Sequence, residues 1–296
     1  MSNFVLTCSS TVDLSNEYLQ ERNIPYVSFH VQLGEDTYAD DMGKSISQEE
    51  LFKRMIDGED AKTSQVSVQQ YLDFFKGFLE EEKDILHICL SSGISGTYNS
   101  ACVAAEELKE EYPDRKIYVV DSYAASSGFG LVVDTLADMR DNGADIEELR
   151  SWIETNKKKL HHWFFTTDLT FFIKGGRVSK TSGFVGNLLG ICPLLNVDFE
   201  GKLIPREKIR GKKKVIKRTL QKMIENAQDG ADYSGKCFIS QAGCYDDAKA
   251  LADLIEETFP KLNDGKVEIY PIGATIGCHT GPGTVSLFFW GSERVD

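Results

Sequence analysis

The residues best suited to chemistry lie in a loop rich in serine and glycine, SSGISGTY, at residues 91–98. An apolar stretch at residues 84–90 predicts a buried strand before the loop, and the residues after it predict a helix. Free backbone N–H groups and the positive end of the dipole at a helix start attract an anion. The glycines allow close approach of a ligand, and Ser92, Ser95 and Thr97 offer hydroxyl donors. The loop therefore predicts an anion site, although an ordinary capped turn has the same composition.

Three further segments are predicted loops, rich in polar residues or glycines in a way that a hydrophobic core does not require. They read TSQVS at residues 63–67, KGGRVS at residues 174–179, and Ile272-Gly273 leading to HTGPG at residues 279–283. Together with SSGISGTY, and in this order, they resemble the motifs of the bacterial DegV family of fatty-acid-binding proteins. Each motif is short, but four of them at compatible spacing, over essentially the whole chain, make the resemblance specific.

The start of the chain departs from the family pattern. The family usually opens with a strand followed by Asp-Ser, then Thr or Ser, then Ala-Asp-Leu. Here the matching stretch is SSTVDL at residues 9–14. Ser9 stands where the family commonly has an acid, so no role for that acid is transferred to this chain.

The resemblance implies a carrier and not an enzyme. Proteins of this family hold a fatty acid while a separate ATP-dependent kinase subunit phosphorylates its carboxylate, and the acyl phosphate then feeds phospholipid synthesis. The expected ligand is therefore a long-chain fatty acid. The expected partners are the kinase subunit and, transiently, a membrane surface. We expect no catalytic residue, no metal and no cofactor.

The site residues implied by the resemblance surround the carboxylate of the ligand. A carboxylate that is buried without partners costs several kcal/mol, so charge-assisted donors must surround it. The matching positions are Thr63, Ser64, Ser95, Gly96, Thr97, Arg177 and His279. We expect His279 in a loop, because glycine and proline are frequent at residues 277–283. The candidates for an apolar tail pocket between two domains are Phe164, Phe165, Phe171, Phe172, Ile191, Leu194 and Leu195.

A serine hydrolase is an alternative interpretation of the same residues. The sequence GISGT at residues 93–97 lies on a strand-to-helix turn, and Ser95, Asp121 and His279 occur in the order of a hydrolase triad. However, the GxSxG motif is missed at its last position, and no separate oxyanion loop is evident. A hydrolase therefore stays an alternative.

A small-molecule kinase is the second alternative, because the N-terminal domain of the DegV family resembles that of dihydroxyacetone kinases. The chain has no GxxxxGK[ST] loop, and GFG at residues 128–130 lacks the third glycine of a dinucleotide loop. No cysteine or histidine spacing matches a common zinc site. The sequence offers no phosphate loop with which to bind ATP by itself.

The composition is that of a soluble globular protein of 296 residues with a net charge of −13. This charge argues against binding to nucleic acid. No run of 18 apolar residues and no secretory signal is present. Seven cysteines without a CxxC pair indicate reduced thiols, so we expect a cytoplasmic protein.

Basic residues concentrate in the second half of the chain. Residues 1–155 hold 12 Lys and Arg against 30 Asp and Glu, whereas residues 156–296 hold 21 against 16. Eight basic residues fall within residues 206–218, which we call the basic cluster. They are Arg206, Lys208, Arg210, Lys212, Lys213, Lys214, Lys217 and Arg218. The basic cluster is either an ordinary solvated surface or a docking surface for an anionic partner or lipid headgroups.

The elements that position these residues form two groups. Up to residue 155, helices alternate with short apolar strands, expected at residues 4–7, 27–31, 85–90 and 117–120, which predicts a parallel sheet with helices on both faces. Beyond residue 163, consecutive strands joined by a tight turn predict a mixed or antiparallel sheet with helices on one face. The fold class is α/β. We expect an N-terminal αβα domain at residues 1–157 with the anion loop, and a C-terminal α+β domain at residues 158–296 that completes the lipid pocket.

The segment TSGFVGNLLG, at residues 181–190, has an unusual composition. It is apolar yet holds three glycines, which suits a rigid helix poorly. We hypothesise a lid that opens at a membrane and exposes Phe184, Leu188 and Leu189. A short packed helix with close glycine contacts is the alternative.

Overall fold

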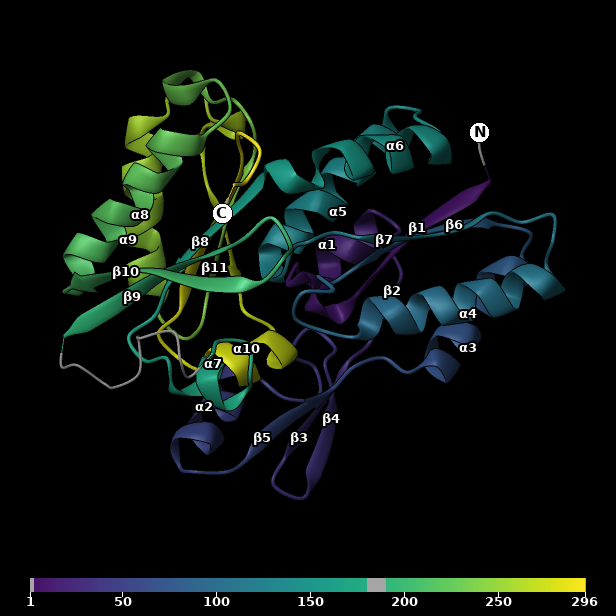
Figure 1. Cartoon of the computed structure of the whole chain (residues 1–296), viewed down its shortest axis with the longest axis horizontal. Coiled ribbons are helices and arrows are strands. Elements are labelled where there is room, and N and C mark those ends of the chain that lie inside the picture. Colours follow the sequence, from purple (N-terminus) through teal and green to yellow (C-terminus); the bar gives the residue numbers. More distant parts are fainter. Residues whose placement is uncertain (1–2, 180–189, 296) are drawn as a thin grey trace.

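The computed structural model describes residues 3–179 and 190–295. The hypothesised lid at residues 181–190 therefore lies outside the described residues, except for Gly190. The described residues form three β-sheets (Figure 1). None of their helices combines the length and the apolar character needed to cross a bilayer.

The first sheet has four parallel strands from the first half of the chain. In spatial order its strands are β2 (Tyr26–Val27), β1 (Phe4–Ser9), β6 (Asp84–Cys89) and β7 (Ile117–Asp121). Helices cover both faces, which is why the strand interiors are apolar without alternation. These helices are α3 (Val68–Glu80) and α4 (Thr97–Glu111) on one face, and α1 (Asn16–Glu21), α5 (Ser126–Asp141) and α6 (Ile146–Asn156) on the other.

The second sheet has six strands and mixes parallel and antiparallel pairs. In spatial order its strands are β10 (Leu203–Arg210), β9 (Ile191–Val197), β8 (Leu160–Phe165), β13 (Val285–Trp290), β11 (Cys237–Gln241) and β12 (Glu268–Pro271). Only β11 and β12 run parallel among these pairs in the described part of the chain. Two helices pack on one face, α8 (Lys212–Asn226) and α9 (Tyr245–Thr258). The predicted α/β class with one parallel and one mixed sheet is confirmed.

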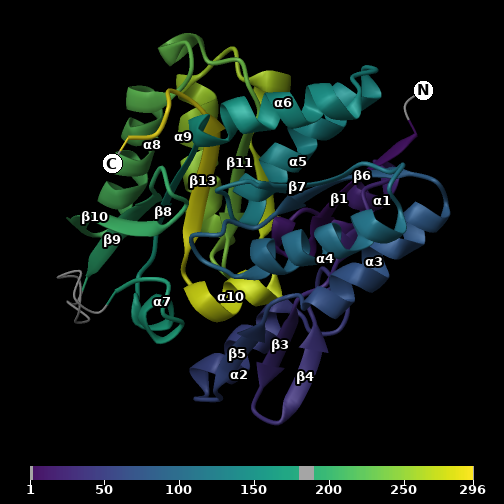
Figure 2. The same ribbon diagram turned by 45° about the vertical axis from the view of Figure 1, so that its right-hand side comes forward.

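The other face of the second sheet is covered by α5, so the expectation of helices on one face only was wrong. Phe238 and Phe288 of this sheet pack against the apolar residues of α5, which lies between the two larger sheets (Figures 1 and 2). Gly128 permits the close approach. A Cβ atom at Gly128 would lie 2.5 Å from Cδ1 of Phe288 and 2.6 Å from Nε2 of His162. A helix between two sheets is buried almost all round, and eleven of the sixteen residues of α5 are buried.

The third sheet has three antiparallel strands, and the sequence did not predict it. Its strands, in spatial order, are β4 (Asp36–Ala39), β3 (His30–Leu33) and β5 (Ala61–Ser64). The single strand expected at residues 27–31 was wrong, since Val27 ends β2 and His30 begins β3 in another sheet. Val27, Phe29 and Val31 are all buried, so the apolar pattern continues while the hydrogen-bonding partners change.

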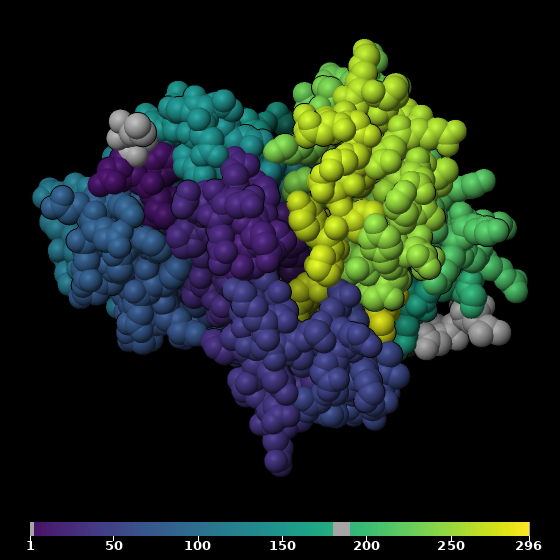
Figure 3. Space-filling model, turned by 180° about the vertical axis from the view of Figure 1, so that it is seen from behind, coloured from purple at the N-terminus to yellow at the C-terminus, as the bar shows by residue number. Residues whose placement is uncertain are grey.

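The third sheet lies beside three short helices, α2 (Gln48–Ile56), α7 (Thr170–Lys174) and α10 (Ala274–Thr280). The hairpin of β3 and β4 projects from the body of the molecule (Figure 3). The opposite edge of this sheet is β5, which follows α2 in the chain. Elements from both halves of the sequence thus meet at this sheet.

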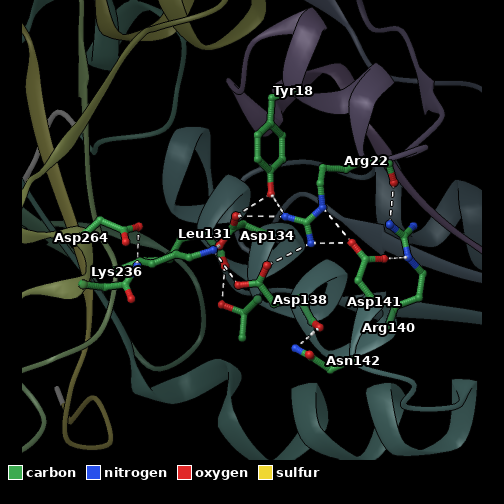
Figure 4. Close-up of polar contacts among 12 residues, drawn as sticks. Tyr18, Arg22, Leu131, Asp134, Asp138, Arg140, Asp141, Asn142, Lys236 and Asp264 are labelled. Carbon is green, nitrogen blue, oxygen red and sulfur yellow. Dashed lines mark hydrogen bonds and ion pairs between the residues drawn. The ribbon is translucent and has the colours of Figure 1, made fainter.

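A network of charged residues joins α1, α5 and the residue before β11 (Figure 4). The Lys236 ammonium lies 2.6 Å from a carboxylate oxygen of Asp134 and 2.6 Å from one of Asp138. The Arg22 guanidinium lies 2.9 Å from Asp138, and the Tyr18 hydroxyl donates to Asp134 at 2.5 Å. This network connects the helical layer of the first sheet with the second sheet.

Candidate functional site

A cavity of about 390 Å³ lies between the start of α5, helix α10 and the inner face of the second sheet. Its polar lining residues are Thr63, Ser64, Gln65, Ser95, Ser126, His162, Arg177, Thr275, His279, Thr280 and Ser286. Its apolar lining residues are Phe29, Leu90, Ile94, Ala125, Phe164, Phe172, Val197, Leu203, Ile276 and Phe288. A lining of this kind suits a ligand with a polar head and an apolar body.

Five of the seven predicted site residues line this cavity. They are Thr63, Ser64, Ser95, Arg177 and His279. Thr63 Oγ1 lies 2.8 Å from Nε2 of His279, although the two residues are 216 positions apart in the sequence. Thr63 and Ser64 stand at the end of strand β5, not in the loop that their composition indicated. Folding thus gathers hydroxyl, guanidinium and imidazole groups from separate motifs.

The KGGRVS motif forms a turn after α7 that holds both Arg177 and His279. The Arg177 guanidinium donates to the carbonyl oxygen of Ile94 at 3.2 Å and to that of Gly175 at 2.5 Å. A Cβ atom at Gly175 would lie 2.3 Å from Nδ1 of His279. Glycine is therefore required at position 175, because any side chain there would displace the imidazole ring.

His279 lies on helix α10, so the expectation that it lies in a loop was wrong. The helix ends at Thr280, and the next residue, Gly281, has φ +65° and ψ 177°, a conformation that essentially only glycine adopts. Burial, and the nearby charge of Arg177, lower the pKa of His279 to about 4. The ring is therefore neutral at neutral pH. If Nε2 carries the proton and donates to Thr63, the Thr63 hydroxyl keeps its own hydrogen for an anion.

Ser95 faces the cavity, whereas Gly96 and Thr97 lie behind it and are not among its lining residues. The Thr97 N–H donates to the Ser95 hydroxyl oxygen at 3.3 Å, which leaves the hydroxyl hydrogen of Ser95 free to donate to a ligand. The Thr97 side chain is buried and lies 2.8 Å from the Tyr71 hydroxyl. Gly96 packs against Gln65, where a Cβ atom would lie 2.7 Å from Oε1.

The first half of the SSGISGTY motif contacts the C-terminal half of the chain. The Ser91 hydroxyl donates to the carbonyl oxygen of Gly201 at 2.8 Å. A Cβ atom at Gly93 would lie 2.6 Å from the carbonyl carbon of Gly201, so only glycine fits there. Sequence reasoning assigned these residues to anion binding alone and missed this contact with the turn between β9 and β10.

Asp121 does not complete a hydrolase triad in this structure. Its carboxylate accepts from the N–H groups of Ser92, at 3.2 Å, and Tyr123, at 3.0 Å. The imidazole of His279 pairs with Thr63 and not with Ser95. In the described structure, therefore, His279 does not contact Ser95 and Asp121 does not contact His279, although a hydrolase triad needs both contacts.

Only two of the seven expected tail residues line the cavity. They are Phe164 and Phe172. On β8, Phe164 points to the cavity and Phe165 points to the core under α8 and α9, because successive side chains of a strand face opposite sides. Leu194 packs in the same core as Phe165. The periodicity of a buried strand does not say which face meets a ligand.

The sequence reasoning also missed lining residues that lie far from the four motifs. Ala125 and Ser126 begin α5, directly after the parallel strand β7. Ligands bind where parallel strands end, so the rule that singled out SSGISGTY could also have indicated these two residues. Phe29 and Phe288 gave no such signal, because an apolar residue in a strand is ordinarily part of the core.

The cavity carries little charge. Among the described lining residues, Arg177 alone is charged at neutral pH. Burial lowers its pKa from the ordinary value of 12.5, but a guanidinium stays protonated at any physiological pH. The described residues contain no cluster of three or more side chains suited to hold a metal ion. One cation among neutral donors matches a single anionic group.

The chain is similar to known proteins over nearly its whole length. A family model described as an uncharacterised protein of the DegV family matches residues 3–291. A DegV domain-containing protein of Clostridium perfringens is 34% identical over 294 residues, which is 99% of each chain. A fatty acid-binding protein of Thermotoga maritima is 33% identical over 283 residues, or 94% of each chain. A solved DegV family protein from Thermus thermophilus, described for its fatty acid binding, is 27% identical with a TM-score of 0.86, over 98% of this chain and 99% of that one.

Proposed function

Because this chain belongs to the DegV family, we propose that it binds one long-chain fatty acid in the cavity, with the carboxylate at Thr63, Ser64, Ser95, Arg177 and His279. The observation that carries the proposal is the pairing of one cation and several hydroxyl donors with an otherwise apolar cavity. Relatives described as binding fatty acids support it. Gly96 and Thr97 would act indirectly, by holding Ser95.

The energetics suit such a ligand. Each buried methylene contributes about 0.8 kcal/mol, so a common fatty acid gains on the order of 10 kcal/mol before the costs of ordering. Burying its carboxylate costs several kcal/mol unless charge-assisted donors surround it. Arg177 and the hydroxyl hydrogen of Ser95 are such donors, and the hydroxyl hydrogen of Thr63 is a third when Nε2 of His279 carries the proton.

We further propose that the chain is a carrier, which presents the carboxylate to a separate ATP-dependent fatty acid kinase subunit in the cytoplasm. The family resemblance supports this step, and so does the engagement of Asp121 and His279 in contacts that leave no triad. We assign no catalytic residue to the chain. The runner-up functions, a serine hydrolase and a small-molecule kinase, have no supporting geometry among the described residues.

A transient contact with a membrane or with the kinase is proposed for the basic cluster. Some of its members already have intramolecular partners, such as Arg218 with Glu207 at 2.8 Å and Lys212 with Asp247 at 2.6 Å. Lys213, Lys214 and Lys217 are exposed. These three lysines are the members that we expect to meet an anionic surface.

Mass spectrometry of material extracted from the purified protein tests the proposed cargo. We expect one long-chain fatty acid per monomer, and rebinding of a fatty acid after its removal. Repeated extraction without a fatty acid, together with failure of the stripped protein to bind one, would reject the proposal. Incubation of the loaded protein with p-nitrophenyl esters, or with ATP alone, should give no turnover. Turnover would favour one of the two alternatives.

A further inference from the structure

Two buried carboxylates lie beside the cavity and take no part in the site described above. Asp13 follows β1 and Asp40 follows β4, and their exposed fractions are 3% and 1%. A Cβ atom at Gly273 would lie 2.5 Å from Oδ1 of Asp13 and 3.5 Å from Oδ1 of Asp40. Both oxygens therefore face the same point of the backbone. No basic side chain among the described residues forms an ion pair with either carboxylate.

The Asp40 carboxylate accepts from three donors. The N–H groups of Ala274 and Thr275, in the first turn of α10, donate to it at 3.2 Å and 3.3 Å. The Ser10 hydroxyl donates to it at 3.1 Å, and the Ser10 oxygen accepts from the N–H of Phe29 at 3.0 Å. Asp40 thus ties helix α10 to the segment of Phe29, and both line the cavity.

The Asp13 carboxylate has fewer partners. The hydroxyl of Ser126, at the start of α5, donates to Oδ2 of Asp13 at 2.5 Å. Oδ1 of Asp13 is buried and has no hydrogen-bond partner among the described residues. Asp13 and Ser126 both have positive φ, at 46° and 55°, a conformation that non-glycine residues adopt only when their surroundings impose it.

The two carboxylates cannot both be ionised at low cost. Like charges that face each other in a low dielectric, without a cation, repel strongly, and a proton held by one of them removes the repulsion. Asp40, with three donors, is suited to carry the charge. Asp13, whose Oδ1 makes no hydrogen bond of normal geometry and lies against the backbone of Gly273, is better suited to carry the proton. Burial is the main cause that raises the pKa of both carboxyl groups. The charge of Asp40 also raises the pKa of Asp13, whereas the hydrogen-bond donors around each carboxylate lower its pKa.

We propose that Asp13 and Asp40 share one proton at neutral pH and act as positioning residues for the cargo site. The pair holds α10, which carries His279, and the start of α5, which carries Ser126, against one another. The positioning role rests on the proposed function, because it assumes that a fatty acid binds in the cavity. The shared proton does not depend on the proposed function.

Loss of this proton at alkaline pH should weaken the packing of α10 against the start of α5 and so speed release of the ligand. A carboxyl whose pKa is raised in the folded state stabilises that state at low pH, and the contribution is lost as the pH rises through the folded pKa. The two thiols and the phenol that face the pair do not ionise near neutrality. The pKa of Cys278 is raised to about 12, and those of Tyr26 and Cys8 are raised above their ordinary values of 10.0 and 9.0. The remaining neighbour, Asp41, bonds to Ser45.

Infrared spectroscopy of the unliganded protein tests the proton directly. At about pH 7, where ordinary Asp and Glu side chains are ionised, the wild type should show a protonated carboxyl band. Asp13→Asn should remove this band, since the amide mimics the neutral acid. The control Asp114→Asn, at an exposed position, should keep it. If the wild type shows no protonated carboxyl band, or if its band persists in Asp13→Asn, the proposal of a shared proton is overturned.

Release of oleic acid to phosphatidylcholine vesicles tests the positioning role. As the pH rises from neutral to alkaline, release from the wild type should accelerate, whereas Asp13→Asn should release slowly at every pH. Asp40→Asn should release about tenfold faster throughout, because α10 loses charge-assisted acceptors. If Asp40→Asn does not fold, the pH dependence of oleic acid release from Asp13→Asn alone tests the positioning role. If release from Asp13→Asn accelerates with pH as release from the wild type does, the positioning role is overturned. If the wild type never binds oleic acid, the proposed function is rejected. The infrared spectra then still test whether Asp13 and Asp40 share a proton.

Discussion

At the scale of single residues, the polar end of the cavity depends on hydroxyl groups that are already hydrogen-bonded to neighbouring residues. Ser95 accepts from the N–H of Thr97, and Thr63 lies within hydrogen-bond distance of His279. For Ser95 this contact fixes the position of the hydroxyl group and leaves its hydrogen for a ligand, and the same holds for Thr63 when Nε2 of His279 carries the proton. The proposed carboxylate site is therefore formed before the ligand arrives, which lowers the cost of binding.

We predict that Ser95→Ala weakens binding of a fatty acid by about 1.5–3 kcal/mol, because a charged acceptor loses one donor. Ser92→Ala is the matched control, since Ser92 lies in the same loop but is exposed and does not line the cavity. Titration of stripped protein with a fluorescent fatty acid measures both variants. If Ser95→Ala and Ser92→Ala bind the fatty acid with equal affinity, Ser95 does not contribute to carboxylate binding.

The sequence indicated the chemistry of these residues but not all of their neighbours. Thr63, Ser95, Arg177 and His279 belong to motifs whose polar and glycine residues have no reason to lie in a core. Ser126 and Phe29 have ordinary local contexts, and only the fold brings them to the cavity. Residues whose role depends on contacts distant in sequence leave no local pattern to recognise.

At the scale of elements, helix α5 links the fold to the cavity. It packs against the inner face of the second sheet through Gly128, beside Phe288 and His162, and both of these side chains line the cavity. The separation between helix and sheet therefore sets the width of the cavity at this end. A larger residue at position 128 would push aromatic rings into the space for the ligand.

We predict that Gly128→Ala destabilises the protein by about 1–3 kcal/mol, because the added methyl overpacks a buried contact. Binding of longer fatty acids should weaken more than binding of shorter ones. Gly77→Ala is the control, since a Cβ atom in the exposed turn of α3 would meet no atom within 4 Å, and alanine favours a helix over glycine by up to about 1 kcal/mol. Urea unfolding and a chain-length series measure both effects. A Gly128→Ala protein as stable as the wild type would contradict the close approach.

The same scale shows where prediction from sequence succeeds. The strands and helices of the two larger sheets have long periodic patterns with clear caps, such as Ser67 before α3 and Asp145 before α6. The third sheet has strands of four residues, with β4 and β5 partly exposed, so neither length nor periodicity signals it. Helix α10 has seven residues and two glycines nearby, which resemble loop composition.

At the scale of the whole molecule, the two halves of the chain are joined along α5, at the turn held by Ser91, and through the charged network of Lys236. We propose the division into residues 1–157 and 158–296 as a description of two sheets with their own helices. Figures 1 and 2 show that α5 is shared between them. The cavity lies along this shared region, so the stability of the junction and the integrity of the site are coupled.

We predict that Lys236→Met lowers the free energy of unfolding by about 1–3 kcal/mol, because the Asp134 carboxylate, whose side chain is 3% exposed, loses its nearest cation. Lys249→Met is the control, since Lys249 pairs with Asp253 on the exposed surface of α9. Surface pairs of this kind contribute about 1 kcal/mol or less. Chemical unfolding measures the difference. Equal effects of the two substitutions would mean that the network does not hold the halves together.

The histidines of the whole molecule predict how stability changes in acid. Burial is the main cause that lowers the pKa of His87 to about 3 and those of His161 and His279 to about 4. Between about pH 6.5 and about pH 4 the unfolded chain therefore binds protons that the folded chain excludes, so stability falls as the pH falls. The contribution is complete above the unfolded pKa of about 6.5, and each unit of difference is worth about 1.4 kcal/mol.

Unfolding by urea at a series of pH values tests this expectation, with His279→Gln as the variant. Glutamine keeps a donor toward Thr63 but cannot titrate, so the fall in stability between about pH 6.5 and about pH 4 should become shallower by roughly one proton. The control is His30→Gln, the same substitution at a partly exposed position on β3 that does not line the cavity. The carboxyl pair of Asp13 and Asp40 acts in the opposite direction, since its shared proton stabilises the folded state on the acid side. An unchanged acid slope in His279→Gln would show that the fold does not lower the pKa of this imidazole.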